Sequence, residues 1–178
     1  MLIVGGGNVG LEKLTFLLKS SPKAKVTLVA KMIIPEVSAL AADFHVDLIE
    51  RAYHKSLLNN KQIVIAATDD LSVNLQVHRD CKKENILVNL ADNPDYCDFY
   101  MGGIVTKGNV KLAISTNGKS PTAAKRLRQF FEEILPEDIN DLVENLNQYR
   151  KTLKGDFEDK VNKMNELTKE MIKLKKDK

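Results

Sequence analysis

The feature that most constrains the fold is a cluster of glycines near the start of the chain, Gly5-Gly6-Gly7-Asn8-Val9-Gly10. It directly follows the apolar run Leu2-Ile3-Val4 and precedes leucines spaced as on one face of a helix. A tight strand-to-helix turn needs Gly5 to lack a side chain, Gly7 leaves the backbone open to a ligand, and Gly10 lets the helix pack closely on the strand. The first twenty residues therefore predict a strand, a tight turn and a helix.

The same alternation continues along the chain. Further strands are predicted at residues 25–30, 46–49, 63–67 and 86–90, and helices at residues 34–44 and 72–85. The run 63–67 is almost wholly apolar, as in a strand covered on both faces of a parallel sheet. This order predicts an α/β fold with a Rossmann-like parallel sheet over residues 1–92.

In such a sheet the glycine turn binds phosphate, because the start of the next helix offers unpaired N–H groups and a positive dipole end. We therefore predict that Gly5, Gly7 and Gly10 bind a dinucleotide; a turn needed only for packing is the alternative. The acid that holds the adenosine ribose after the second strand of NAD-binding domains is missing. Ala30-Lys31-Met32 stands there instead, which leaves NADP open as the cofactor.

Acidic residues follow two of the buried strands. Thr68, Asp69 and Asp70 come after residues 63–67, and Asp92 closes Val88-Asn89-Leu90-Ala91. Ligands bind at the carboxyl ends of parallel strands, so we predict that Thr68 and Asp69 contact the cofactor and that Asp92 points into the same crevice. The alternatives are a helix N-cap at residues 68–70 and an ordinary turn aspartate at position 92.

The pattern changes after Asp92, where Asn93-Pro94-Asp95 indicates a turn or linker. Residues 103–106 and 110–115 predict a hairpin, and the segment Thr116–Pro121 leads into a helix. We expect three regions: 1–92, a β-containing region at 93–121, and a helical region at 122–178. Two apolar helix faces are predicted in the last region, on either side of Gly155: Ile139, Leu142, Val143, Leu146 and Tyr149, then Phe157, Val161, Met164, Leu167, Met171 and Leu174.

Composition narrows the classes of function. The chain has 178 residues, 43% hydrophobic and 29% charged, with a net charge of +3, which is too small to indicate nucleic-acid binding by itself. No apolar run approaches the roughly 18 residues of a membrane span. Cys81 and Cys97 form no CxxC pair, which favours reduced thiols and a cytoplasmic protein. The three histidines are scattered, so no protein metal site is predicted.

Taken together, several motifs resemble one family, the precorrin-2 dehydrogenase / sirohydrochlorin ferrochelatase module found at the front of sirohaem synthases. The resemblance runs from residue 1 to near residue 150. The matching segments are Val4–Val9, Ala66–Asp70 with Asn74, Val88–Asp92, Cys97-Asp98-Phe99 and Ala113–Pro121, followed by Ala124, Arg126, Leu127 and Arg128.

The resemblance implies NAD-dependent oxidation of precorrin-2 to sirohydrochlorin, with insertion of ferrous iron to give sirohaem as a second activity. It implies that Asp92 is catalytic and that the chain forms a homodimer through its middle region, while the helical region helps to enclose the tetrapyrrole. The residues implied to contact NAD are Gly7, Asn8, Val9, Lys31 and Met32. The chain departs from the family pattern at Met101-Gly102-Gly103 and at Asn117, both near the expected substrate site.

This chemistry suits the residue types. The nicotinamide takes a hydride, so the protein has to supply orientation and a proton acceptor, and a carboxylate in a dry crevice has a pKa raised towards the working pH. We expect Asp92 to be that acceptor. The tetrapyrrole carries several carboxylates, and a solvated helix face is the alternative to a basic substrate site. The predicted substrate-binding residues are Ser115, Thr116, Lys119, Arg126 and Arg128.

Two other hypotheses stay open. The chain could be a non-catalytic NAD(P)-sensing module that controls a partner through its helical region, which would bind NAD without turning over a tetrapyrrole. It could also be a dehydrogenase for a smaller substrate, although the segment Ser115–Pro121 and the nearby arginines argue against this.

Overall fold

The computed structural model describes residues 1–117 and 119–169. The chain divides into two compact units. The first combines Met1–Ile104 with Leu112–Phe130, and the second combines Val105–Lys111 with the chain from Phe131 onwards. The division at residues 92 and 121 made from the sequence stays a prediction.

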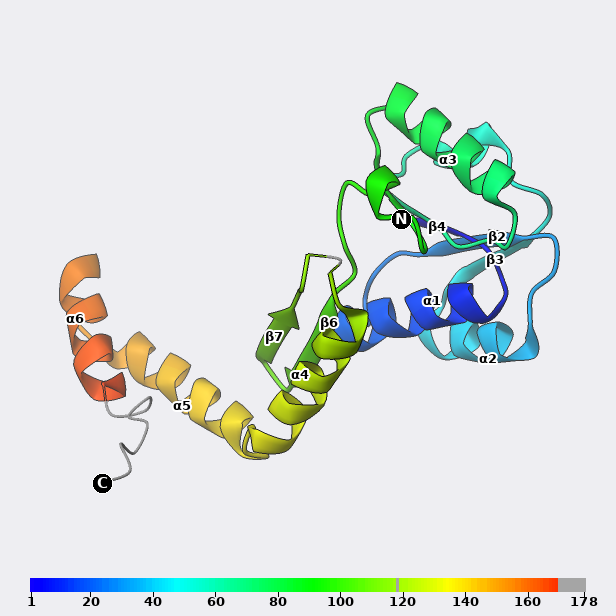
Figure 1. Cartoon of the computed structure of the whole chain (residues 1–178). Coiled ribbons are helices and arrows are strands. Elements are labelled where there is room, and N and C mark those ends of the chain that lie inside the picture. The colour runs from blue at the N-terminus through cyan, green and yellow to red at the C-terminus, as the bar shows by residue number, and fades with distance from the viewer. Residues whose placement is uncertain (118, 170–178) are drawn as a thin grey trace. The chain divides into compact units, whose positions relative to one another are not determined.

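The first unit is built on five parallel strands (Figure 1), β1 (Leu2–Val4), β2 (Thr27–Ala30), β3 (Asp47–Glu50), β4 (Ile63–Ala66) and β5 (Leu87–Leu90). Their order in the sheet is β3-β2-β1-β4-β5, and each neighbouring pair is parallel. The predicted Rossmann-like fold class is confirmed. The order of the strands reverses between β1 and β4. In open sheets of this kind ligands bind at such a reversal, which here lies at the carboxyl end of β1.

Helices cover both faces of this sheet (Figure 1): α1 (Asn8–Ser20) and α2 (Pro35–Phe44) on one side and α3 (Leu71–Lys83) on the other. Leu14 and Leu18 of α1 are almost fully buried against one face. Val77 and Cys81 of α3 are fully buried against the other. Each such aliphatic side chain contributes roughly 1.5–3 kcal/mol through burial, so the helix faces predicted from sequence hold the sheet between them.

Two short 3₁₀ helices were not predicted. In η1 (Lys55–Leu58) the His54 ring accepts the Ser56 N–H, and the buried Leu57 and Leu58 join the core under α3. The other, η2 (Pro94–Tyr96), lies in the segment predicted as a turn. Both are too short to produce a helical period in the sequence.

The outer edge of β5 is closed by the segment Cys97-Asp98-Phe99. The Asp98 N–H donates to the Val88 carbonyl (2.8 Å), and the Val88 N–H donates to the Asp98 carboxylate (3.0 Å). Lys82 of α3 forms an ion pair with the same carboxylate. Asn89 donates to the Phe99 carbonyl at 2.8 Å. This segment therefore pairs an edge that would otherwise expose unsatisfied backbone groups.

The remaining elements are β6 (Gly103–Lys107) and β7 (Val110–Ile114), which form the predicted two-stranded hairpin, and the helices α4 (Pro121–Ile134), α5 (Ile139–Thr152) and α6 (Phe157–Thr168). In the second unit, Lys107 donates to the Leu135 carbonyl at 2.6 Å, and the Asn109 N–H donates to Asn140 at 2.9 Å. Gly118, Met171 and Leu174, which belong to the predicted loop and helix face, lie outside the described residues.

No helix within the described ranges is both long enough and apolar enough to cross a membrane.

We predict that Asp98→Asn lowers the free energy of unfolding by about 1 kcal/mol near neutral pH, because a charge-assisted bond is lost. Hydrogen bonds from Lys82 and from the Val88 N–H hold the pKa of the Asp98 carboxyl below its usual value. Such a group adds stability above its unfolded-state pKa and loses it as the pH falls through its folded-state pKa. The difference between wild type and variant should therefore shrink below about pH 4 in urea denaturation.

Asp95→Asn, which removes a nearby exposed carboxylate, is the matched control. An equal loss of stability in both variants, or a difference that is constant down to pH 3, would contradict this role for Asp98.

Candidate functional site

Hydrogen bonds hold the carboxyl ends of four strands side by side. The Gly5 N–H donates to the Val29 carbonyl (2.9 Å), and the Ala67 N–H donates to the Val4 carbonyl (2.7 Å). One strand further, the Ala91 N–H donates to the Ala66 carbonyl (2.9 Å). The structure thus places the glycine turn, Thr68 and Asp92 along one edge of the sheet, as the sequence predicted.

The three glycines of the motif have different physical roles. Gly5 has φ +130°, and a Cβ there would lie 2.3 Å from the Ala67 carbonyl oxygen. A Cβ on Gly10 would lie 2.2 Å from the Gly5 oxygen. Gly7 differs, since a Cβ there would meet no protein atom within 4 Å. The fold therefore explains Gly5 and Gly10, whereas no described atom of the chain crowds Gly7, which leaves room there for a ligand.

The start of α1 is open to a ligand. Gly7 is the N-cap residue, so no side chain satisfies the first N–H groups of the helix, and Gly7, Asn8 and Val9 are exposed. Unsatisfied N–H groups and the positive end of the helix dipole favour a pyrophosphate at this position. The residues at the turn therefore fit a dinucleotide.

The segment after β2 lies against the same turn. The Ile34 N–H donates to the Gly6 carbonyl (3.0 Å), and a Cβ on Gly6 would lie 2.5 Å from the Met32 oxygen. The Met32 side chain is 80% exposed, and Lys31 is exposed as well. Both predicted contact residues thus flank the turn with their side chains accessible.

The segment after β4 is largely occupied by internal hydrogen bonds. Asp70 caps α3 by accepting the N–H groups of Ser72 (2.8 Å) and Val73 (3.3 Å). Hydrogen bonds, foremost from the Ser72 hydroxyl, lower the pKa of Asp70. The Thr68 hydroxyl donates to Asn74 at 2.7 Å, and the Asn74 amide donates back to the Thr68 carbonyl at 2.9 Å. The N-cap interpretation is therefore confirmed, while cofactor contacts from Thr68 and the exposed Asp69 stay predictions.

Asn74 is a structural residue whose role sequence reasoning missed. It is only 4% exposed and fixes the loop that carries Thr68. A signal was present, because Asn74 occupies a position of the buried stripe that continues with Val77 and Cys81. A polar residue on such a stripe needs partners, and here they are backbone and hydroxyl groups of the ligand edge.

Asp92 differs from the expectation in one respect. It follows β5 at the carboxyl edge, where φ is +62°, a left-handed conformation that Asp tolerates better than most residues. Its side chain is exposed, and within the described part of the chain its carboxylate has no hydrogen-bond partner. The expected dry crevice is therefore not formed by residues 1–117 and 119–169, which leave the Asp92 side chain exposed.

The hydroxyls of the segment after β7 are used to fold the loop. Ser115 accepts the Asn117 N–H (3.1 Å), and Thr116 both accepts the Ser120 N–H and donates to the Ser120 carbonyl. Ser120 in turn accepts the Ala123 N–H at 3.2 Å. Ser115 and Thr116 thus shape the entry to α4, and direct substrate contacts from them stay predictions.

The predicted basic residues do not share one face. Arg126 and Arg128 lie two positions apart on α4, and residues at that spacing point in different directions. Arg126 donates to Gln129 at 3.2 Å, while the aliphatic part of Arg128 packs against Gly103. Lys119 lies in the preceding loop and is exposed. The structure therefore brings all three onto the same segment, with Arg126 and Arg128 pointing in different directions.

Neither cysteine has the surroundings of a nucleophile. Burial raises the pKa of the Cys81 thiol to about 12. Burial likewise raises the pKa of Cys97, whose thiol contacts the backbone of Leu90 and the carbonyl of Asn93. In residues 1–117 and 119–169 no three His, Cys, Asp or Glu side chains gather as a metal site would require.

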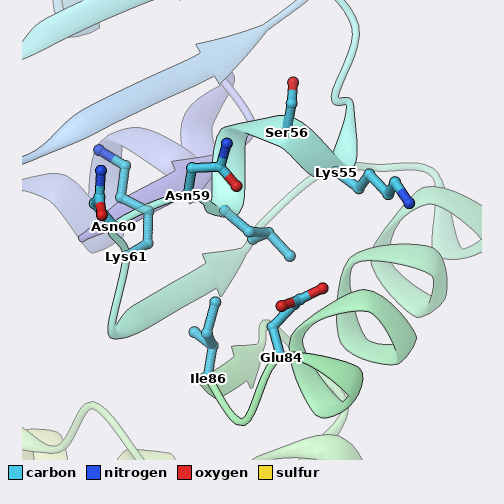
Figure 2. A pocket seen from close by; sticks show the side chains of 8 residues that line it. Lys55, Ser56, Asn59, Asn60, Lys61, Glu84 and Ile86 are labelled. Atoms are coloured by element: carbon cyan, nitrogen blue, oxygen red, sulfur yellow. The ribbon is translucent and has the colours of Figure 1, made fainter.

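A cavity of about 540 Å³ lies away from this edge (Figure 2). It is lined by η1, by Asn59-Asn60-Lys61 and by Glu84 and Ile86, which precede the amino ends of β4 and β5. The cavity is therefore at the opposite end of the sheet from the glycine turn. The candidate site is an open edge rather than an enclosed pocket.

Two family models match the chain. Residues 1–103 match a family model described as "Putative NAD(P)-binding", and residues 107–134 match one described as "Sirohaem biosynthesis protein central". Proteins named "Siroheme synthase" from Psychrobacter cryohalolentis and Pseudoalteromonas atlantica are each 37% identical to the chain. The matches cover 87% and 88% of this chain but only 29% and 33% of those proteins, so the chain spans about a third of their length.

The fold is shared with a solved structure titled "SirC, precorrin-2 dehydrogenase". The TM-score is 0.76 at 24% sequence identity, and the match covers 93% of this chain and 82% of that one. At this identity the likeness establishes the fold.

We predict that Gly7→Ala leaves the fold intact and weakens NAD binding at least about tenfold, because the new methyl group occupies the space of the pyrophosphate. Thermal unfolding and isothermal titration calorimetry measure the two effects. Gly5→Ala should instead lower the free energy of unfolding by about 1–3 kcal/mol, because its methyl group overlaps the Ala67 carbonyl. Unchanged NAD affinity in a folded Gly7→Ala protein would refute this role for the turn.

Proposed function

Because the chain belongs to this NAD(P)-binding family, we propose that it oxidises precorrin-2 to sirohydrochlorin in sirohaem biosynthesis, with NAD as the hydride acceptor. The match of residues 107–134 to the sirohaem central model supports the pathway. The relatives named siroheme synthase and the shared fold with a precorrin-2 dehydrogenase support the reaction. NAD is proposed as the acceptor on the resemblance noted in the sequence.

The observation that carries the proposal is the register of the carboxyl edge. The β1–β4 and β4–β5 pairings put the glycine turn, which is open at Gly7, and Asp92, which has no hydrogen-bond partner among the described residues, on the same edge, two strands apart. A dinucleotide bound across the end of β1 would extend along this edge in the direction of Asp92. The edge thus offers room for a cofactor and, beside it, a group that can accept a proton.

The chemistry divides between cofactor and protein. Bound NAD supplies the hydride acceptor, and the chain has to orient the substrate and take up a proton. Asp92 is the proposed proton acceptor. Its carboxylate is exposed in the protein alone, so we infer that the tetrapyrrole itself excludes water from the site when it binds. Such desolvation favours transfer of the proton to the carboxylate.

Charge supports the proposed substrate. Precorrin-2 carries several carboxylates, and the loop and helix after β7 present Lys119 and Arg126 as exposed cations in the same compact unit as Asp92. Arg128 is only partly exposed, and its aliphatic part packs on Gly103. We therefore assign direct contacts with the substrate carboxylates first to Lys119 and Arg126.

We predict that Asp92→Ala lowers turnover of precorrin-2 at least about 100-fold, because a general base contributes this much or more. The absorbance of NADH and of sirohydrochlorin measures turnover, and calorimetry checks that NAD still binds. Asp43→Asn, which changes an exposed carboxylate on α2, is the control and should keep full activity. Full activity of folded Asp92→Ala would show that another group accepts the proton.

Iron insertion is a second proposed activity. The same carboxylate could receive the protons that leave the pyrrole nitrogens as ferrous iron enters the ring. Sirohydrochlorin supplied with ferrous iron, in the absence of NAD, tests this activity separately. Failure to form sirohaem would restrict the proposal to the dehydrogenase step.

We further propose that the chain forms a homodimer through α4 and the hairpin region. Leu127 and Ile134, seven residues apart, lie on one face of α4 and are 44% and 51% exposed. Large apolar side chains repeated on one helix face are typical of an association surface. A non-catalytic module that controls a partner would use the same surface, and it would bind NAD without any turnover of precorrin-2.

We predict that Ile134→Glu raises the dimer dissociation constant at least about tenfold, because it places a charge in an apolar interface. Light scattering after size-exclusion chromatography measures the change in mass. Leu87→Glu, at a side chain that is 52% exposed on β5, is the control and should leave the mass unchanged. A monomeric wild-type protein would refute the homodimer.

The free state of the two cysteine thiols supports a proposal about the cellular compartment of the protein. Cys81 and Cys97 are both free, and the Cys97 thiol takes part in the hydrogen bonding that closes the edge of β5. An oxidised Cys97 could not donate this bond. We therefore place the protein in the reducing cytoplasm.

A further inference from the structure

Two cations stand where a bound dinucleotide would place its adenosine ribose. Lys31 directly follows β2, and Arg51 directly follows β3. The register pairs Ala30 with Glu50, so Lys31 and Arg51 leave the ends of two adjacent strands. Both are exposed. An acid after β2 holds an unmodified ribose, whereas a cation near this position accommodates a 2′-phosphate.

The alternation of β2, continued past its last residue, indicates the face of the sheet on which Lys31 lies. Val29 is buried against the α3 side of the sheet, and Leu28 is buried against the other side. The alternation puts Lys31 on the side of Val29. Asp70 at the start of α3 agrees with this direction: its pKa is lowered mainly by hydrogen bonds from Ser72 and Val73, and also by the charge of Lys31. Lys31 thus lies over the gap between the ends of β2 and α3.

The nearby carboxylates do not replace the missing ribose acid. Asp70 is committed to capping α3 through Ser72 and Val73. Glu50 is one strand further from the glycine turn, and its pairing with Ala30 puts it on the side of the sheet opposite to Lys31. The ribose end of the site therefore has an accessible cation, and Asp70, the carboxylate in electrostatic range of Lys31, is engaged in capping α3.

We propose that Lys31, with Arg51 beside it, forms a subsite for the 2′-phosphate of NADP, so that NADP binds at the same glycine turn as NAD. This inference rests on the proposed function only in requiring that a dinucleotide lies across the carboxyl edge. Lys31 and Arg51 then act as specificity residues for the cofactor and take no part in the oxidation of the tetrapyrrole.

Calorimetry on the full chain tests the subsite without any turnover. Adenosine 2′,5′-bisphosphate and AMP differ only in the 2′-phosphate, so their affinities isolate its contribution. We expect the bisphosphate to bind at least about tenfold more tightly than AMP, and NADP to bind within about tenfold of NAD.

Lys31→Asp should weaken binding of NADP and of the bisphosphate at least about tenfold more than it weakens binding of NAD, because only the first two ligands carry the 2′-phosphate. Arg51→Gln should give a smaller loss of the same kind. Lys55→Asp makes the same charge change beside the cavity at the other end of the sheet (Figure 2) and should leave all four affinities unchanged.

The outcomes separate the two proposals. Binding of NAD with NADP at least about a hundredfold weaker would overturn the subsite and leave the proposed function standing. Equal losses for NAD and NADP in Lys31→Asp would also overturn it, because Lys31 would then contact a part common to both. Failure of the wild type to bind either dinucleotide would overturn the proposed function together with the subsite.

Discussion

The close contact between Gly5 and the end of β4 is the constraint on which the rest of the site depends. β1 and β4 are adjacent although two other strands separate them in the sequence. The order in which successive strands are added to the sheet therefore reverses at this pair. The Ala67 N–H bonds to the Val4 carbonyl, and the Gly5 backbone lies where any side chain would overlap the Ala67 oxygen. Without this fit the turn could not lie flat on the edge, and neither the start of α1 nor the segment after β5 would face the same ligand.

The fold was predictable because its signals are periodic and local. The apolar strand 63–67, the leucines of α1 and the glycine turn each report burial or backbone geometry directly, and the helices and strands follow them closely. Hydrogen bonds between residues that only the folded chain brings together were not predictable. Asp98 pairs with Val88 and Lys82, and Asn74 with Thr68, and nothing in the spacing of these residues states which partner each one finds.

The candidate site was predictable in position but less so in its surroundings. Asp92 and the glycine turn could be assigned to one edge because all carboxyl ends of a parallel sheet point the same way. The exposure of Asp92 was less predictable, because the exposure of a residue depends on which other segments of the chain cover it. The sequence suggested a dry crevice, whereas the chain leaves Asp92 in water. Likewise, Arg126 and Arg128 are close in the sequence, but their side chains point in different directions once α4 forms.

The two ends of the open edge set different physical demands. For the proposed oxidation, the exposed Asp92 carboxylate would gain reactivity from a substrate that excludes water. For the proposed 2′-phosphate subsite, Lys31 and Arg51 would act in water, where screening weakens each charge and two cations hold a dianionic phosphate better than one. If both proposals hold, an open edge separates two tasks: the cofactor would be recognised while the site is hydrated, and proton transfer would follow once the bound substrate excludes water.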